Sequence, residues 1–279
     1  MPGLAPHLPD SVVGLPPMGQ RLLHLALEDG PDAVVEAVDR LDDRIWPILS
    51  NQVEHALAHW REPDQGIWEV RGEPRHFTSS KVMCWVAVDR GARLARIRAK
   101  TELAHRWQAA ADEIHAEICE RAVDERGVFT QHYDTDALDA SLLLMPLVGF
   151  LPPDDPRVRA TVLAIADELT EEGLVLRYRV KEADDGLSGE EGSFTICSFW
   201  LVSALALIGE HLWARQLCEK LLSFASPLGL YAEELDPHSG RHLGNFPQAF
   251  THLALINAVM HVIGDEHGLP ARGILPPSL

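Results

Sequence analysis

The sequence is short of basic residues and has no cluster of them. Lysine and arginine number 24 against 42 acidic residues, which gives a formal net charge of −18. Without a group of cationic side chains to contact phosphates, we expect neither nucleic acid nor an anionic membrane surface as a partner. The acidity fits a neutral ligand such as a small carbohydrate, and it fits plain solubility equally well.

Cysteines are few and long apolar runs are absent. No Cys-x-x-Cys spacing occurs, and each cysteine lies in an apolar run with helical spacing, which favours buried free thiols over disulfides or metal ligands. No run reaches the roughly 18 apolar residues of a membrane span, and no signal peptide is visible. We therefore expect a soluble, cytoplasmic protein, provided that Met1 is the true start. The four cysteines are Cys84, Cys119, Cys197 and Cys218.

Motifs for several kinds of chemistry are also missing. His55 and His59 have a spacing that can bind zinc, but they have no third ligand and no His-Glu-x-x-His pattern. Neither a Gly-x-Ser-x-Gly elbow nor a Gly-x-x-x-x-Gly-Lys loop is present, so serine-dependent hydrolysis and nucleotide chemistry have no local support. The sequence therefore predicts a protein without metal or cofactor.

What is present is helical periodicity through most of the chain, while alternating β-branched runs are scarce. We predict an all-α domain of nine helices. Their expected ranges are 18–29, 32–60, 79–95, 101–124, 136–148, 155–170, 193–208, 210–224 and 246–263.

The connections between these helices alternate in length. Those after the third, fifth and seventh helices have about two to six residues, as expected between antiparallel neighbours, whereas those after the second, fourth, sixth and eighth have about 11 to 22. The long connections also hold most of the aromatic and charged residues outside the helices. Helical hairpins with their functional loops on one rim are expected, and a ring of helix pairs, an (α/α)6 toroid, is the preferred architecture.

The first long connection contains the dipeptide Trp68-Glu69. An apolar ring packed on a carboxyl group favours its protonated form, which a general acid needs. A surface ion pair of Glu69 with Arg71 or Arg75 is the alternative interpretation.

A second acidic connection, with Glu233 and Glu234, follows three long connections later. In a ring of six helix pairs, three pairs are half the circumference, so the two acidic loops face each other across the mouth. A sugar between two carboxylates about 6.5–9.5 Å apart is the arrangement of an inverting glycosidase, in which one acid protonates the leaving oxygen and the other activates water.

Four stretches of the chain resemble glycoside hydrolase family 15. They begin at Asp64 (Asp-Gln-Gly-Ile-Trp-Glu-Val-Arg-Gly), at Arg75 (Arg-His-Phe-Thr-Ser-Ser-Lys-Val-Met-Cys-Trp), at Glu191 (Glu-Gly-Ser-Phe-Thr-Ile-Cys-Ser-Phe-Trp) and at Gly244 (Gly-Asn-Phe-Pro-Gln-Ala-Phe-Thr-His). With the patterns between them they span about residues 35 to 265. The family contains glucoamylases, glucodextranases and α,α-trehalases on an (α/α)6 barrel, which release β-glucose by inversion.

The resemblance implies a role for particular residues. The family's general acid falls on Glu69 and its general base on Glu233, with Glu234 as the less favoured choice. Arg177 and Tyr178 resemble a substrate-contacting pair, and a guanidinium can bind adjacent sugar hydroxyls; a surface ion pair of Arg177 with Glu171, Glu172 or Glu182 is the alternative. Trp68 is expected to stack on a sugar, while Arg71 and Lys81 bond hydroxyls or orient the loop.

One family motif is missing. Members carry a Trp-x-Arg-Asp sequence that grips the distal hydroxyls of glucose, and this chain has no Arg-Asp dipeptide. Nine helices in place of twelve also indicate an incomplete barrel over residues 18–265, between proline-rich tails at 1–17 and 266–279. Two function classes follow: an active α-glucosidase, as a homo-oligomer or completed by an N-terminal chain, or a catalytically impaired or glycan-binding remnant.

Overall fold

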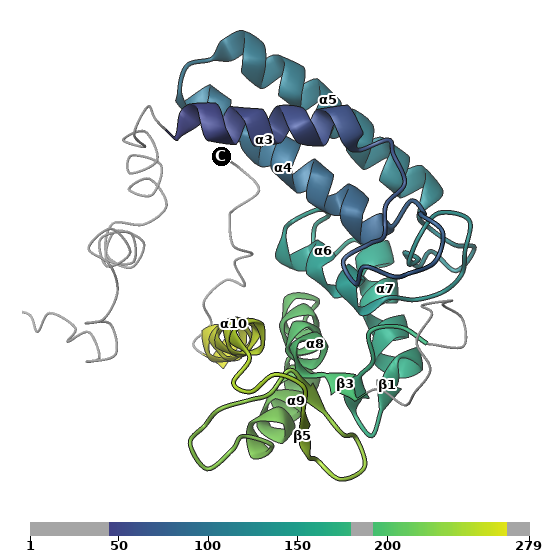
Figure 1. The fold of residues 1–279 in the computed structure, drawn as a ribbon, viewed down its shortest axis with the longest axis vertical. Helices are drawn as coiled ribbons and strands as arrows, with labels where there is room; N and C mark the ends of the chain where they lie inside the picture. Colours follow the sequence, from purple (N-terminus) through teal and green to yellow (C-terminus); the bar gives the residue numbers. More distant parts are fainter. Residues whose placement is uncertain (1–44, 180–191, 267–279) are drawn as a thin grey trace, which may run out of the picture.

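The computed structural model describes residues 45–179 and 192–266, in which α-helices follow one another along an open arc (Figure 1). Helices α3, α4 and α5 lie together at one end of the arc, α6 and α7 in the middle, and α8, α9 and α10 at the other end. The helices are α3 (Trp46–His59), α4 (Thr78–Ile97), α5 (Thr101–Arg121), η2 (Ala140–Leu143), α6 (Leu144–Leu147), α7 (Pro156–Glu168), α8 (Thr195–Leu207), α9 (His211–Ser223) and α10 (Ala249–Glu266).

Most of the predicted helices are confirmed within about three residues at each end. The expected helix 32–60 ends as predicted, with α3 stopping at His59, but its first part lies outside the described residues, as does all of 18–29. The close packing of α3, α4 and α5 depends on Gly91 in α4. A Cβ atom there would lie 2.6 Å from Val53 of α3 and 3.2 Å from Trp107 of α5.

The predicted helix 136–148 is wrong over its first part. Asp139 is extended, with φ −144° and ψ 133°, and its side chain accepts a hydrogen bond from the backbone N–H of Ser141. This is the geometry of an N-cap, so the helix begins only at Ala140, as a 3-10 turn that continues into α6. Gly149, at φ +66°, follows the short helix and turns the chain away.

Five two-residue strands, which the sequence pattern did not predict, lie in the long connections. Strands β1 (Thr170–Glu171) and β2 (Leu174–Val175) form an antiparallel pair. Strands β3 (Ser193–Phe194), β4 (Glu234–Leu235) and β5 (His242–Leu243) form an antiparallel sheet in the order β3-β4-β5. Such short strands carry too few residues to show alternation in the sequence.

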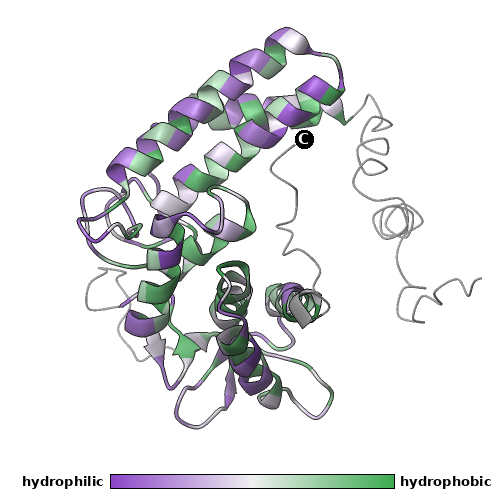
Figure 2. Cartoon of the chain, turned by 180° about the vertical axis from the view of Figure 1, so that it is seen from behind, coloured by the Kyte–Doolittle hydropathy of each residue, from purple (hydrophilic) through white to green (hydrophobic). Residues whose placement is uncertain are grey.

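The core of the C-terminal half is α8. Of its 13 residues, 11 are buried, and the helix is coloured as hydrophobic along most of its length in Figure 2. It packs against α9 on one side and α10 on the other. None of the helices among the described residues is both long and apolar enough to cross a membrane. All four cysteines are free thiols, as predicted; two of them are buried, whereas Cys84 and Cys119 are only partly buried.

Backbone hydrogen bonds between successive long connections confirm that these form a single rim. The N–H of Thr78, where the connection 60–77 ends, donates to the carbonyl of Gln131, and the N–H of Ala140 donates to the carbonyl of Arg177. Thr195, the first residue of α8, donates to the carbonyl of Glu233. Each connection is therefore fixed to the next, and the residues they carry are brought to one side of the arc.

Candidate active site

The connection 60–77 folds back on itself and presents Glu69 at its surface. Asp64 holds the turn, because its Oδ1 accepts hydrogen bonds from the N–H of Gly66 at 2.7 Å and from the Ser80 hydroxyl at 3.0 Å. Gly66 has φ +68°, and a Cβ atom at this position would lie 2.9 Å from the ring of Phe77. Glycine is therefore required here by both the backbone conformation and the close approach.

Glu69 is exposed and has φ +51°, a left-handed conformation that non-glycine residues seldom adopt. Within the described residues its carboxylate pairs with neither Arg71 nor Arg75, so the ion pair considered from the sequence does not form. Strained residues of this kind concentrate at functional sites, where the surrounding structure holds them in place. Glu69 thus presents a carboxyl group on a constrained turn, with no ion pair to the part of the chain that the structure describes.

The side chain of Trp68 points to a carboxylate other than Glu69. Its indole Nε1 lies 3.0 Å from both oxygens of Asp139, and its ring centroid is 6.0 Å from Phe194 and 6.2 Å from Trp200. Trp68 therefore joins the first long connection to Asp139 and to the start of α8.

Arg177 completes this group of side chains. Its guanidinium carbon lies 4.3 Å from the ring centroid of Phe194, 5.4 Å from that of Trp68 and 5.2 Å from that of Tyr178, which is buried. A guanidinium at these distances from aromatic rings makes cation–π contacts. We call Trp68, Arg177, Tyr178, Phe194 and Trp200 the central cluster.

Glu233 is held by neutral hydrogen-bond donors. Its Oε2 accepts from the backbone N–H and the side-chain amide of Asn245, both at 3.2 Å, and its Oε1 accepts from the amide of Gln248 at 3.1 Å. A carboxylate has about four lone-pair sites, so these three donors leave one for a further hydrogen bond. The donors orient the group without neutralising its charge.

Glu234, the alternative base, has a different environment. Its Oε2 accepts a hydrogen bond from the N–H of Gly192 at 3.2 Å, and it stands in β4 opposite Phe194 of β3. Adjacent residues of an extended segment point to opposite sides, so only one of the two glutamates can face a given ligand. Glu233 directly precedes β4, the strand that pairs with Phe194 of the central cluster, and its carbonyl accepts a hydrogen bond from the N–H of Thr195.

Arg71 and Lys81 do not join the central cluster. Arg71 is exposed. Lys81 is buried, and its ammonium donates to the carbonyls of Trp60 at 2.6 Å and Glu62 at 2.5 Å. Burial lowers the pKa of Lys81 below its ordinary value. These contacts fit the second of the two roles predicted for Lys81, that of orienting the connection 60–77.

Sequence reasoning missed three groups at this site: Asp139, the aromatic pair Phe194 and Trp200, and the amides of Asn245 and Gln248. Asp139 is 2% exposed, and burial raises the pKa of its carboxyl group. The Asp-x-Ser spacing with Ser141 is a signal for an N-cap, but nothing local in the sequence connects it to Trp68, 71 residues earlier.

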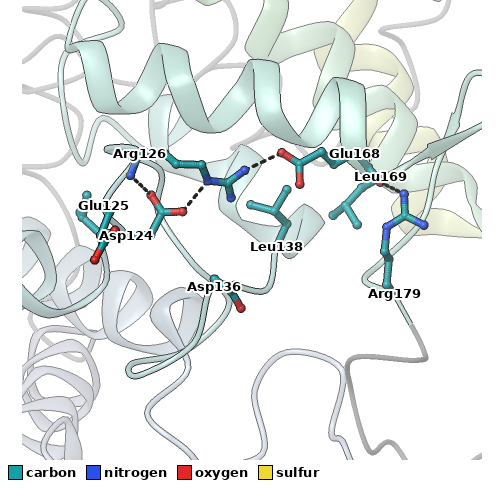
Figure 3. A pocket seen from close by; sticks show the side chains of 9 residues that line it. Asp124, Glu125, Arg126, Asp136, Leu138, Glu168, Leu169 and Arg179 are labelled. Carbon is teal, nitrogen blue, oxygen red and sulfur yellow. Dashed lines mark hydrogen bonds and ion pairs between the residues drawn. The ribbon is translucent and has the colours of Figure 1, made fainter.

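A cavity of about 710 Å³ adjoins the site but contains neither candidate carboxylate (Figure 3). Its wall includes Arg126, which bonds to Asp124 at 2.8 Å and to Glu168 at 2.7 Å. Arg126 thus joins two of the acidic side chains in the wall, an arrangement that supports the wall of the cavity.

Comparison with known proteins identifies relatives for most of the chain. Residues 18–214 and 209–260 match the sequence profile of Glycosyl hydrolases family 15. The trehalase of Mycobacterium tuberculosis is 70% identical over 240 residues, which are 86% of this chain and 35% of that protein. The trehalase of Thermoplasma acidophilum is 38% identical over 225 residues, 80% of this chain and 38% of the relative. The chain thus spans little more than a third of their length.

Solved structures share the fold. A bacterial glucoamylase complexed with acarbose superposes with a TM-score of 0.64 at 14% identity, over 90% of this chain and 40% of the other. The glucoamylase from Saccharomycopsis fibuligera superposes with a TM-score of 0.65 at 11% identity, over 89% of this chain and 68% of the other. The arc of helical hairpins is therefore part of an (α/α)6 barrel, as the sequence predicted. With its profile and its fold in agreement, the chain belongs to Glycosyl hydrolases family 15.

Proposed function

We propose that this chain carries the catalytic pair of an inverting, exo-acting α-glucosidase, with Glu69 as general acid and Glu233 as general base. The observation that supports this most is the central cluster. Glu69 follows Trp68 directly, and Glu233 is bonded through its carbonyl to Thr195, the neighbour of Phe194. An aromatic and cationic surface between an acid and a base suits a sugar ring.

The proposed reaction conserves atoms and protons. Protonated Glu69 gives its proton to the glycosidic oxygen while the bond from that oxygen to the anomeric carbon breaks. A water molecule attacks the anomeric carbon from the opposite face and gives a proton to Glu233. The free lone-pair site of Glu233 accepts this proton, and exchange with solvent restores both groups.

The remaining predicted residues have binding roles in this proposal. Arg177 and Tyr178 contact sugar hydroxyls, and Trp68 offers part of its ring to the sugar. Arg71, exposed two residues after Glu69, is available for a hydroxyl as well. Trehalose is the preferred substrate, since the most similar relatives named above are trehalases; the ends of α-1,4-glucans are the second choice.

We also propose that a complementing N-terminal chain closes the ring, with a homo-oligomer as the other possible assembly. The support is the outer face of α10, whose residues 249–264 include no charged side chain. Apolar exposure of this extent is typical of an interface. Its exposed members are Phe250 (67%), Leu253 (58%), Ile256 (58%), Met260 (61%) and Ile263 (43%).

The partial domain is proposed to cover residues 18–265, and the four free thiols favour a reducing compartment such as the cytoplasm.

A second function is a catalytically impaired or glycan-binding remnant of the same scaffold. The observations that favour it are the missing Arg-Asp dipeptide and the open arc that residues 45–179 and 192–266 form. Such a protein would bind trehalose without cleaving it.

Turnover of trehalose and maltose by Glu69→Gln and Glu233→Gln variants tests the assignment. Each should lose about two to four orders of magnitude in kcat, the usual range for general acid–base groups. Glu73→Gln, an exposed glutamate of the same connection, is the control and should keep the wild-type rate. Near-wild-type rates in both test variants would refute the pair. Calorimetric binding of trehalose without any glucose release by the wild-type chain would establish the remnant instead.

A further inference from the structure

Asp139 is a buried carboxylate that the proposed reaction does not use. Its Oδ1 accepts hydrogen bonds from the backbone N–H of Ser141 at 2.8 Å and from the Ser141 hydroxyl at 2.6 Å, and its Oδ2 accepts one from the amide of Gln131 at 3.1 Å. The indole Nε1 of Trp68 lies 3.0 Å from both oxygens. A charge removed from water is tolerated only when its hydrogen bonds are satisfied, and this one is fully satisfied.

The donors to Asp139 come from separate parts of the rim. Trp68 belongs to the connection 60–77, Gln131 to the connection before η2, and Ser141 to η2 itself. The backbone N–H of Ala140, the residue after Asp139, donates to the carbonyl of Arg177 at 2.8 Å. Asp139 therefore lies where the turn of Glu69 and the position of Arg177 are fixed together.

We infer that Asp139 is a positioning residue: by holding the indole of Trp68, it fixes the strained turn that aims the Glu69 carboxyl group at the substrate. This rests on the proposed function of Glu69. A left-handed residue persists only when its surroundings hold it, and the side chain of the preceding residue is bonded to Asp139. Among the described residues, no other hydrogen bond of the Trp68 indole is seen.

An amide replaces this carboxylate only in part. The side chain introduced by Asp139→Asn would have one acceptor oxygen and one NH2 group, whereas both Ser141 and Gln131 require acceptors on opposite sides of the group. The NH2 group would thus face an N–H donor, either on the Ser141 side or on the Gln131 side. The substitution keeps the shape of the residue but removes its charge and one of the two acceptor oxygens that the Trp68 N–H contacts.

The first test is a double-mutant cycle of Asp139→Asn and Trp68→Phe, measured as kcat and KM on trehalose. Trp68→Phe keeps an aromatic ring but removes the N–H donor. Each variant should lower kcat about tenfold to a hundredfold, the value of one charge-assisted hydrogen bond, with a smaller change in KM. The double variant should be little slower than either single variant, because both remove the same contact. Additive losses would overturn the inference.

The second test needs no activity. In two-dimensional ¹H–¹⁵N NMR of the full chain, the indole resonance that disappears in Trp68→Phe belongs to Trp68. The inference predicts that Asp139→Asn moves this resonance and leaves the other tryptophans nearly unchanged. Asp155→Asn is the matched control, because Asp155 is likewise an N-cap, of α7, but bonds to Arg157.

The two tests separate the inference from the proposed function. An unmoved Trp68 resonance in Asp139→Asn, or an equal movement in Asp155→Asn, would overturn the anchor whether or not the chain is active. A moved resonance in a chain that hydrolyses neither trehalose nor maltose would support the anchor and refute the proposed reaction.

Discussion

Replacing Gly244 by alanine should impair catalysis far more than folding. Gly244 has φ +70°, and a Cβ atom there would lie 2.8 Å from Oε2 of Glu233 and 3.1 Å from its Cβ. Ordinary contact begins at 3.4 Å, so Oε2 must retreat by about 0.6 Å, which is 3.4 Å less 2.8 Å. Such a movement disrupts the hydrogen bonds from Asn245 that orient the carboxylate.

The magnitude follows from two separate costs. Alanine in the left-handed region costs about 1–2 kcal/mol of stability, whereas misplacing a catalytic group by about 1 Å can cost about a hundredfold in rate. We therefore expect Gly244→Ala to lower kcat on trehalose about tenfold to a hundredfold while it lowers the free energy of unfolding only by the backbone cost.

Gly229→Ala is the control for the backbone term. Gly229 has φ +72°, and a Cβ atom there would meet nothing within 4 Å. Urea unfolding should show a similar loss of stability in both variants, and only Gly244→Ala should lose activity in a glucose-release assay. Equal activities of the two variants would refute the view that Gly244 leaves room for the Glu233 carboxylate.

Three further predictions concern the supporting structure. Lys81→Met should lower the free energy of unfolding by about 1–3 kcal/mol, because the buried carbonyl of Trp60 and the partly buried carbonyl of Glu62 lose their donor. Unchanged stability with a raised KM would indicate a substrate contact instead. Burial raises the pKa of Asp139 in the native state above its ordinary value of 3.8. Between the ordinary and the raised pKa the native state binds a proton that the unfolded state has lost, so the free energy of unfolding falls as the pH rises. Urea unfolding of Asp139→Asn at several pH values should lack this dependence. Leu253→Asp on α10 should reduce association with a complementing chain or a second copy in analytical ultracentrifugation, whereas Ala109→Asp on the exposed face of α5 should not.

The helices could be predicted because each buries one face over several turns. The α4, α5 and α9 segments repeat apolar residues at helical spacing, and their ends are predicted to within about three residues. The segment 136–148 misled the prediction because its apolar residues lie in a region too short to show a period. Its start is decided by the hydrogen bond that the backbone N–H of Ser141 donates to the side chain of Asp139.

The candidate site could be predicted only in part. Glu69, Glu233, Arg177 and Tyr178 stand in motifs with local signals. The contact of Trp68 with Asp139 and the amides around Glu233 depend on tertiary structure. Because the connections of the rim meet through long-range hydrogen bonds, no window of the sequence contains both partners of these contacts.

The anomeric form of the glucose first released from α,α-trehalose tests the central claim most directly. Proton NMR in the first moments of the reaction distinguishes α-glucose from β-glucose before mutarotation mixes them. If Glu69 protonates the glycosidic oxygen while Glu233 directs water to the opposite face, one half of trehalose appears as β-glucose and the leaving half as α-glucose, in equal amounts. Release of α-glucose alone would mean retention and would contradict the assignment of Glu69 and Glu233 as an acid and base separated by a water molecule.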